Sequence, residues 1–301
     1  MNSPVNSPVN SIDELQEGLH GQRYFASRGL ATTIFLALKL GKPLFLEGEA
    51  GVGKTEVAKV LAALLDTELV RLQCYEGLDV HHAVYEWNYT RQMMHIRLLE
   101  AQGQRAVESE LFGPDFLLQR PLLRAIDAAH GKPPVLLIDE IDRSDEEFEA
   151  FLLEILSDFQ ITIPEIGTIK AERPPVVIVT SNRTREVHDA LKRRCLYSWI
   201  DYPSFDDELK IVLAKVPEAP AQLARQVTAF VQELRQAELY KVPGIAETLE
   251  WTAALVALDR DALDEAVVDA TLGVILKYRE DVEKVQGEMT STIVGRVRAG
   301  V

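Results

Sequence analysis

A short glycine-rich motif constrains this chain more than any other feature of its sequence. The segment GEAGVGKT at residues 48–55 fits the pattern GxxxxGK[ST] in full. An apolar run at 44–46 comes directly before it, and apolar residues at helical spacing follow it as far as Leu65. A glycine turn that binds nothing would also join a strand to a helix. Because the full pattern stands in the strand–loop–helix context that it requires, we expect a phosphate-binding loop.

The residue types of this loop predict what each position does. Glycines let backbone N–H groups close around phosphate oxygens, and the following helix adds the positive end of its dipole. We expect Lys54 to reach the β- and γ-phosphates of ATP, and Thr55 to ligand Mg²⁺ through its hydroxyl. The predicted nucleotide-binding residues are Gly48, Glu49, Ala50, Gly51, Val52, Gly53, Lys54, Thr55 and Asp139.

Further apolar runs predict the strands of a sheet around this loop. They lie at residues 68–72, 135–138 and 176–179. Strands that alternate with helices form a parallel sheet covered on both faces, and ligands bind at the carboxyl ends of its strands. The second of these runs ends in Asp139 and Glu140, and the third leads to Asn182. We therefore expect an α/β P-loop domain with these polar residues at one edge.

The polar residues at this edge suit phosphoryl transfer, which needs a phosphate cradle and a metal held by a carboxylate. We expect Asp139 to hold Mg²⁺ through water and Glu140 to polarise the attacking water. Asn182 could orient that water or sense the γ-phosphate; it could also simply cap the turn that follows. The predicted metal-binding residues are Thr55 and Asp139.

A basic cluster, Lys192 to Arg194, follows Asn182 by about ten residues in an otherwise acidic chain. An arginine often stabilises the transition state of γ-phosphate hydrolysis. Basic residues also interact favourably with the carboxyl end of a helix, and both roles can hold together. We expect Arg193 or Arg194 to act on the nucleotide of a neighbouring subunit. The predicted catalytic residues are Glu140, Asn182, Arg193 and Arg194.

Composition narrows the possible partners and the compartment. The formal net charge is −15, which disfavours a nucleic-acid-binding surface because phosphate neutralisation needs concentrated Lys and Arg. Two cysteines, Cys74 and Cys195, suit a reducing compartment better than a disulfide framework. No signal-peptide pattern and no membrane-length apolar stretch occurs in the sequence. We expect a cytoplasmic protein that binds no nucleic acid and has no membrane span.

The hydrophobic pattern divides the chain into three parts. Residues 1–11 are rich in Pro, Ser and Asn, and we expect a disordered tail there. Residues 12–203 carry the motifs above, and apolar spacing over 12–40 predicts one helix before the first strand. Residues 204–301 show only helical patterns, so we expect an all-helical lid domain.

The order of these motifs resembles the AAA+ ATPases and, within them, the MoxR family. The string DEIDR at 139–143 looks like that family's Walker B segment, and residues 153–167 resemble its hairpin before sensor 1. Residues 85–116 look like its insert in helix 2. The resemblance implies ATP hydrolysis in a homo-oligomeric ring, by family default a hexamer. Relatives often work with a von Willebrand A domain partner.

Finer features are similar to the CoxD-like branch of that family. They are the segments at residues 73–79, 191–197 and 243–251. This branch implies a chaperone-like remodeller acting in maturation of a molybdenum-containing carbon monoxide dehydrogenase, so the client would be a metalloenzyme. One departure is that Pro243 is followed by Gly244, whereas the family places its sensor 2 arginine there. Arg260, Lys277 and Arg279 are candidate substitutes.

Three other functions share part of this pattern. An ATP-gated switch or adaptor would hydrolyse slowly and deliver a partner. A nucleic-acid motor is disfavoured by the acidic composition, and a small-molecule kinase would not need the lid and hairpin in this order. Two segments are candidate contact surfaces: the loop at Tyr75–Asp79, expected to face a central channel and grip a client chain, and the apolar stretch at 93–99, expected to bind a partner. Tyr75 could equally pack on its own domain, and core packing would account for half of the 93–99 stretch.

Overall fold

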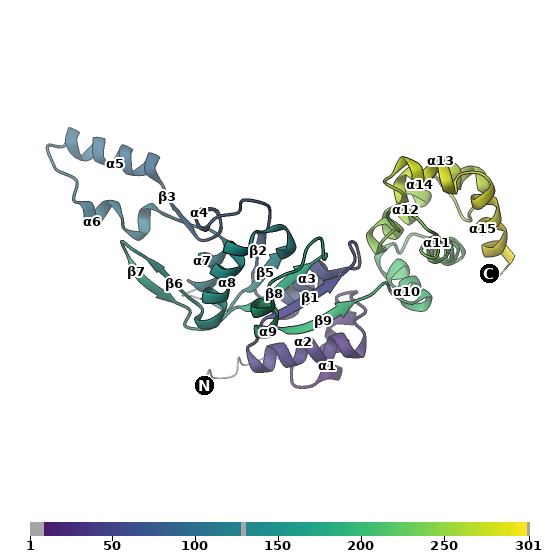
Figure 1. Ribbon diagram of the computed structural model, residues 1–301, viewed down its shortest axis with the longest axis horizontal. Coiled ribbons are helices and arrows are strands. Elements are labelled where there is room, and N and C mark those ends of the chain that lie inside the picture. The colour runs from purple at the N-terminus through teal and green to yellow at the C-terminus, as the bar shows by residue number, and fades with distance from the viewer. Residues whose placement is uncertain (1–8, 128–130, 300–301) are drawn as a thin grey trace. The chain divides into compact units, whose positions relative to one another are not determined.

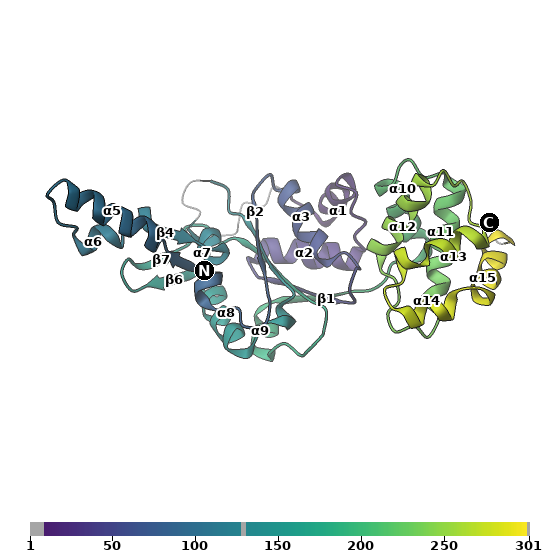
Figure 2. The ribbon, with the colours of Figure 1, turned by 90° about the horizontal axis from the view of Figure 1, so that it is seen from above.

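A computed structural model describes residues 9–127 and 131–299 of the chain. Their contacts divide them into two compact units (Figures 1 and 2). Unit 1 comprises the chain up to Leu15, Arg28–Glu47 and Thr55–Trp199. Unit 2 comprises Gln16–Ser27, Gly48–Lys54 and the chain from Ile200 onward. The glycine-rich loop therefore groups by its contacts with the C-terminal helices.

The elements up to residue 200 include both helices and strands. They are α1 (Ile12–Gly21), α2 (Arg28–Leu40), β1 (Leu44–Gly48), α3 (Lys54–Leu64), β2 (Leu69–Gln73), α4 (Val80–Ala83), β3 (Tyr85–Trp87), α5 (Tyr89–Ala101), α6 (Glu108–Leu111), η1 (Pro114–Phe116), β4 (Leu117–Gln119), α7 (Pro121–Ile126), β5 (Val135–Asp139), η2 (Ile141–Arg143), α8 (Glu146–Asp158), β6 (Gln160–Ile163), β7 (Gly167–Lys170), β8 (Val176–Ser181), α9 (Asp189–Arg194) and β9 (Leu196–Ile200).

The central sheet has five strands in the order β2-β5-β8-β1-β9 (Figure 1). The β2–β5, β5–β8 and β1–β8 pairs are parallel. Strands β1 and β5 are buried along their whole length, which explains why their sequences are continuous apolar runs. The predicted α/β fold with a parallel sheet flanked by helices is confirmed. Strand β9 was not predicted, because its residues alternate between half-buried and exposed and form no apolar run.

The strand order decides which strand ends become neighbours. In the β2–β5 pair, Gln73 lies opposite Asp139, and in the β1–β8 pair, Glu47 lies opposite Ser181. Parallel strands end at the same edge, so the polar residues after β2, β5 and β8 gather there. Helix α7 packs on β2 and β5, and α8 packs on β6 and α9.

Two antiparallel pairs extend this unit. Strands β3 and β4 pair with Tyr85 opposite Gln119, and the chain between them forms α5, α6 and η1. Strands β6 and β7 form a hairpin with Ile163 opposite Gly167. The segment predicted to form that hairpin, 153–167, begins too early, because its first six residues complete α8.

Unit 2 contains six helices after residue 204 in the described part of the chain (Figure 2). They are α10 (Phe205–Lys215), α11 (Ala221–Leu234), α12 (Ile245–Ala257), α13 (Glu265–Ile275), α14 (Arg279–Val285) and α15 (Glu288–Ala299). Helix α11 packs against α10, α12 and α15. Its Phe230 meets Trp251 of α12 in a fully buried core, with ring centroids 5.3 Å apart. Up to residue 299 this region contains no strand, as predicted.

Two predictions near the N-terminus need correction. The helix predicted over 12–40 is two helices, since α1 ends at Gly21 and Arg23 adopts a left-handed conformation with φ 60°. The Tyr24 N–H closes that turn on the Leu19 carbonyl at 2.9 Å. Most of the predicted tail, residues 1–8, lies outside the described residues. Within residues 9–11, Val9 is buried and the Asn10 N–H donates to Glu14, so these residues belong to the folded part.

The chain passes from unit 1 to unit 2 after Trp199, four residues before the predicted boundary after residue 203. That boundary remains a proposal, because the loop at 48–54 and residues 16–27 belong to unit 2 as well. Among residues 9–127 and 131–299, no helix is long and apolar enough to cross a membrane.

Candidate functional site

The glycine-rich loop closes around the side chain of Lys54. The Lys54 side chain is almost fully buried, and its Nζ donates to the carbonyls of Gly48 at 2.8 Å and Glu49 at 2.6 Å. Gly51 and Gly53 have φ of 78° and 94°, which L side chains rarely adopt. The predicted loop residues thus form the compact turn that the motif requires, with the lysine ammonium held on its carbonyls.

Asp139 is the most enclosed of the predicted site residues in unit 1. It ends β5 and is only 2% exposed. Its Oδ1 accepts hydrogen bonds from Oγ1 of Thr55 at 3.0 Å and Oγ1 of Thr180 at 2.6 Å. Thr55 belongs to the first turn of α3, and Thr180 belongs to β8. The fold therefore brings together the two predicted magnesium ligands, Thr55 and Asp139.

The second oxygen of Asp139 faces an arginine from β2. Arg71 donates from Nε at 3.0 Å and from Nη2 at 2.6 Å to Asp139 Oδ2. The same Nη2 reaches Oε1 of Gln73 at 2.5 Å. Arg71 and Gln73 are two residues apart on one strand, so their side chains share a face of the sheet. Arg71 is half-exposed, so solvent also reaches this ion pair.

Glu140 follows Asp139 in a strained conformation. Its φ of 56° is uncommon for a residue other than glycine, and such conformations concentrate at functional sites. Its N–H donates to Thr180 Oγ1 at 2.9 Å. Its Oε2 accepts from Gln73 Nε2 and Arg143 Nη1, each at 3.1 Å. The carboxylate is 31% exposed, so it is held in place but stays open to water.

Asn182 lies just past β8 and is half-buried. Its N–H donates to Asp142 Oδ1 at 3.1 Å. Asp142 is 2% exposed, and its Oδ2 also accepts from the N–H and hydroxyl of Thr184 at 2.8 and 2.7 Å. The loop that carries Asn182 is therefore anchored on the η2 turn directly after Glu140.

The basic cluster at the end of α9 separates into three environments. Lys192 lies 3.5 Å from Oε1 of Glu47 at the end of β1. Arg194 donates to the carbonyl of Leu153 in α8. Arg193 is 81% exposed and makes a 3.5 Å ion pair with Asp189 one turn earlier. Two arginines were predicted to act between subunits. Of these, Arg193 is the one whose ion pair, among the described residues, lies in solvent.

Glu47 also fixes a tyrosine in this region. The Tyr197 hydroxyl donates to Glu47 Oε2 at 2.9 Å. Partial burial and the neighbouring Glu47 carboxylate raise the pKa of Tyr197 to about 12. Burial likewise raises the pKa of Cys74 to about 12, and Asp139 and its acidic neighbours add to that shift. Both groups therefore stay protonated at neutral pH.

The sequence alone did not identify four residues that hold the site: Arg71, Gln73, Thr180 and Asp142. A signal for the first two exists, because they are polar residues at alternate positions of a strand in which the residues between and before them, Leu72 and Val70, are buried. Polar side chains near the carboxyl end of a core strand are typical of a site edge. Which carboxylates they reach depends on strand order.

The residues around Asp139 suit a magnesium ion. Mg²⁺ prefers oxygen ligands, takes few from the protein and keeps several waters. The Thr55 hydroxyl and the Asp139 carboxylate supply two such oxygens 3.0 Å apart. A metal there would replace their mutual hydrogen bond and would meet Arg71 on the other carboxylate oxygen.

This chain is similar to several known proteins. An uncharacterized protein of Staphylococcus aureus (strain bovine RF122 / ET3-1) is 27% identical over 205 residues, which cover 65% of this chain and 69% of that protein. The Thermotoga maritima RuvB Holliday junction branch migration motor is 17% identical with a TM-score of 0.46. The match covers 88% of this chain and 72% of the RuvB chain. A Cytophaga hutchinsonii structure named as a proposed ATPase is 15% identical with a TM-score of 0.48 and covers 96% and 94%.

These two structural likenesses are too weak to carry any argument about function. The family model does carry one, because it matches residues 43–195, just over half of the chain, and spans the glycine-rich loop, Asp139, Glu140 and Asn182. The chain belongs to the AAA domain family, dynein-related subfamily.

Proposed function

We propose that this protein binds ATP with Mg²⁺ and hydrolyses it to ADP and phosphate. The observation that carries the proposal is the 3.0 Å hydrogen bond between Thr55 and Asp139, formed where the glycine-rich loop leads into α3. Thr55 and Asp139 are the two expected magnesium ligands, and Thr55 directly follows Lys54, the lysine expected to hold the phosphates. AAA domains in general hydrolyse ATP, and the described residues contain the parts that this reaction needs.

The residues divide the work as follows. Backbone N–H groups of residues 48–54 and the Lys54 ammonium hold the phosphates. Thr55 and Asp139 hold the metal, which neutralises charge on the phosphates. Glu140 accepts a proton from the attacking water, since its carboxylate is 31% exposed and held by Gln73 and Arg143. Asn182, anchored through Asp142, orients that water or the γ-phosphate.

Two substitutions test this proposal. Lys54→Ala should abolish nucleotide binding, because the loop loses its charge for the phosphates. Glu140→Gln should bind ATP but leave it uncleaved, since the amide keeps the hydrogen-bonding geometry and cannot accept the proton. Binding of a fluorescent ATP analogue and release of phosphate separate the two steps. Hydrolysis by Glu140→Gln at the parent rate would show that another group is the base.

We propose further that catalysis is completed between subunits of a ring, by family default a hexamer. Arg193 lies at the end of α9 with its guanidinium in solvent, paired only with Asp189 among the described residues. A head-to-tail contact that brings such an arginine to the next subunit's nucleotide would repeat and close into a ring. The outcome of mixing two inactive variants tests this proposal directly.

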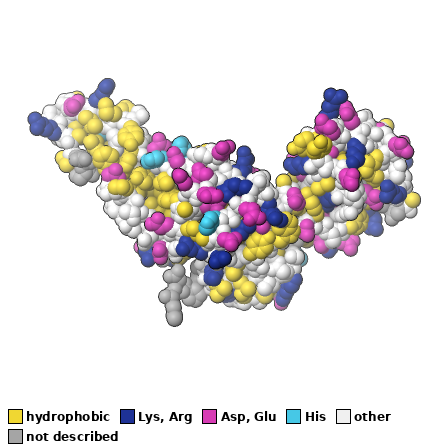
Figure 3. Space-filling view, viewed as in Figure 1, with side chains coloured by type: hydrophobic (Ala, Val, Ile, Leu, Met, Phe, Trp, Pro, Cys, Tyr) yellow, Lys and Arg dark blue, Asp and Glu magenta, His cyan; other side chains and the backbone are white. Residues whose placement is uncertain are grey.

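For the biological role, we propose a chaperone-like remodeller of a metalloenzyme, of the molybdenum-containing carbon monoxide dehydrogenase type, that works with a von Willebrand A domain partner. This rests on the resemblance to the MoxR family and its CoxD-like branch. Two exposed features support client contact. Tyr75, just after β2, is 42% exposed, and the surface over α5 is rich in apolar side chains (Figure 3).

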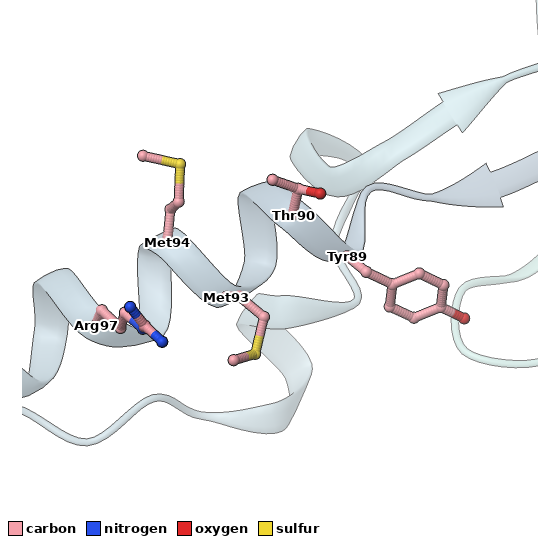
Figure 4. Close-up of a pocket in the computed structure, with 5 residues that line it drawn as sticks. All are labelled: Tyr89, Thr90, Met93, Met94 and Arg97. Atoms are coloured by element: carbon pink, nitrogen blue, oxygen red, sulfur yellow. The ribbon is translucent and has the colours of Figure 1, made fainter.

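The exposed face of α5 forms a shallow groove lined by Tyr89, Thr90, Met93, Met94 and Arg97 (Figure 4). The apolar stretch at 93–99 is less buried than expected. Met93, Met94 and Leu98 are more than half exposed, and Ile96 and Leu99 are half-buried. Deleting residues 93–108 should spare nucleotide binding and weaken capture of a candidate von Willebrand A partner. Equal capture by the deletion variant would exclude this face.

An ATP-gated switch is the second candidate function, since the same site could hydrolyse slowly and deliver a partner. Phosphate release measured with and without the candidate partner and client separates the two. A remodeller should turn over continuously with client present, whereas a switch should release about one phosphate per delivery. A nucleic-acid motor stays disfavoured by the net charge of −15, and salt-dependent DNA binding would test it.

A further inference from the structure

The N-terminus of α12 meets the glycine-rich loop inside unit 2. The Ile245 N–H donates to the carbonyl of Gly51 at 3.0 Å. A Cβ added to Gly244 would lie 2.9 Å from the Ala50 carbonyl oxygen and 2.9 Å from the Gly51 Cα. Real Cβ atoms do not approach backbone that closely, so this contact requires glycine at position 244. The residue that departs from the sensor 2 pattern is therefore the one that lets the helix reach the loop.

The first turn of a helix leaves N–H groups without partners in the helix, and they need acceptors. In α12 the Gly244 N–H donates to the Glu247 carboxylate at 2.9 Å, as in a capping box. The next N–H, that of Ile245, donates to the loop carbonyl of Gly51. The helix start and the loop thus complete each other's hydrogen bonding.

The turn before α12 is itself fixed by a buried arginine. Arg235 donates from Nε to the Pro243 carbonyl at 2.8 Å. Its two terminal nitrogens hold Glu208 of α10 at 2.6 and 2.7 Å, and both side chains are almost fully buried. The guanidinium also lies 4.7 Å from the Tyr202 ring centroid. The position of the α12 terminus against the loop therefore depends on the packing of the lid helices.

We propose that this backbone contact is the coupling between the lid and the nucleotide in this chain, in place of a sensor 2 arginine side chain. A trans peptide group is planar, and its carbonyl and N–H point in opposite directions. Holding the Gly51 carbonyl on Ile245 aims the N–H of Val52 away from α12, as one of the donors that a phosphate loop uses. Gly244 and Ile245 are thus positioning residues for the phosphate-binding amides. This inference rests on the proposed nucleotide binding.

The three arginine and lysine candidates for sensor 2 have other local partners. Arg260 lies 3.9 Å from Asp264, Lys277 donates to the Val274 carbonyl at 2.6 Å, and Arg279 pairs with Glu283 at 2.7 Å. The side chain of Arg279 is 85% exposed. Each makes its contact within three or four residues of itself, which favours the backbone contact at Ile245 as the coupling element.

A proline at position 245 tests the contact. Ile245 is the first residue of α12, where proline is tolerated because its fixed φ suits the helix start, and Gly244 has the extended backbone that a following proline requires. Ile245→Pro therefore removes the donor to Gly51 and little else. Ile245→Ala controls for the side chain, and Glu265→Pro places proline at the first residue of α13 after an equally extended Asp264.

The readout is the dissociation constant of ATP and ADP, measured by calorimetry on the full chain, with thermal unfolding alongside. Ile245→Pro should bind both nucleotides about two- to ten-fold more weakly, as expected for one lost hydrogen bond. Both controls should bind like the parent. Gly244→Ala should also weaken binding, whereas Gly273→Ala, with open space around its Cβ, should not. The proline variant and its α13 control should unfold at similar temperatures.

The outcomes separate this inference from the proposal on which it rests. If the parent chain binds no nucleotide, both are overturned. If the parent binds and Ile245→Pro binds as tightly as Ile245→Ala, only the coupling is overturned. Amide exchange gives an independent measurement: bound nucleotide should slow exchange of the Ile245 N–H in the parent more than in Lys54→Ala. Equal exchange in the two would also overturn the coupling.

Discussion

Arg71 donates two hydrogen bonds, at 3.0 and 2.6 Å, to the single oxygen Oδ2 of Asp139. A cation placed on the Asp139 carboxylate therefore competes with a guanidinium that is already there. We predict that Arg71→Met lowers the Mg²⁺ concentration needed for half-maximal nucleotide binding. Because Arg71 is half-exposed, solvent weakens the ion pair, and the decrease should be no more than about five-fold.

Titration of Mg²⁺ into the protein with a fluorescent ATP analogue measures this midpoint. Arg124→Met is the matched control, since the Arg124 side chain is about as exposed as that of Arg71 and pairs with Glu68 instead of Asp139 in the same unit. An unchanged midpoint would mean that Arg71 does not compete with the metal, and a higher midpoint in Arg71→Met would show that Arg71 supports metal binding.

The free energy of unfolding should fall in alkaline solution because two thiols and the half-exposed Tyr197 phenol have raised pKa values in the folded protein. The pKa of Cys74 is raised from 9.0 to about 12, first by burial and then by Asp139, and that of Tyr197 from 10.0 to about 12. Above pH 9 the unfolded chain loses the thiol proton while the folded chain keeps it, so the free energy of unfolding decreases. The Cys74 thiol contributes a slope of at most about 1.4 kcal/mol per pH unit. The contribution of Tyr197 is smaller, because the residue is 49% exposed and solvent screens the shift.

Urea unfolding at several values between pH 8 and 10.5 measures this slope. Cys74→Ala should unfold with a shallower pH dependence than the parent, whatever its absolute stability. Cys195→Ala should act in the same direction, because burial also raises the pKa of Cys195 to about 12. An equal slope in the parent and Cys74→Ala would mean that this thiol ionises in the folded protein.

The apolar residues of α5 should contribute little to the stability of unit 1. Met93 and Met94 are 54% and 63% exposed, whereas Leu152 of α8 is fully buried in the core. We predict that Met94→Ser changes the free energy of unfolding by no more than about 0.5 kcal/mol. Leu152→Ala should cost about 2–5 kcal/mol. Denaturant unfolding compares them, and a loss above 1 kcal/mol in Met94→Ser would mean that Met94 packs on its own chain.

The sequence determines the strands of this fold better than the partners of its site. Strands β1, β5 and β8 are continuous apolar runs because neighbours cover both of their faces, and such runs are visible without a structure. The hydrogen bonds of Arg71 and Gln73 are different. They follow from the pairing of β2 with β5, which sets Gln73 opposite Asp139 across 65 residues of intervening chain. Nothing in the local pattern encodes that register.

The contacts of the basic cluster could not be predicted from the sequence either. Lys192, Arg193 and Arg194 are consecutive, and the sequence pattern does not distinguish them. The structure directs Lys192 toward Glu47 and Arg194 toward the Leu153 carbonyl, and leaves Arg193 with Asp189. The helical rotation of about 100° per residue sends consecutive side chains in different directions, so one cluster can serve three purposes.

The last prediction concerns Arg193 and the assembly of the active site from two subunits. Arg193 is 81% exposed and its ion pair with Asp189 is also exposed, so little free energy holds it to its own chain. If it completes the site of a neighbour, Arg193→Ala should bind ATP normally and hydrolyse it about three to five orders of magnitude more slowly. Arg194→Ala is the matched control and should lose less, because Arg194 is already engaged by the Leu153 carbonyl. The double variant should be as slow as Arg193→Ala.

Mixing Arg193→Ala with Lys54→Ala should restore part of the activity, because an intact loop can then face an intact arginine. Phosphate release per subunit should also rise with protein concentration as rings assemble. Activity that does not depend on concentration, together with no recovery on mixing, would mean that one chain contains the complete site.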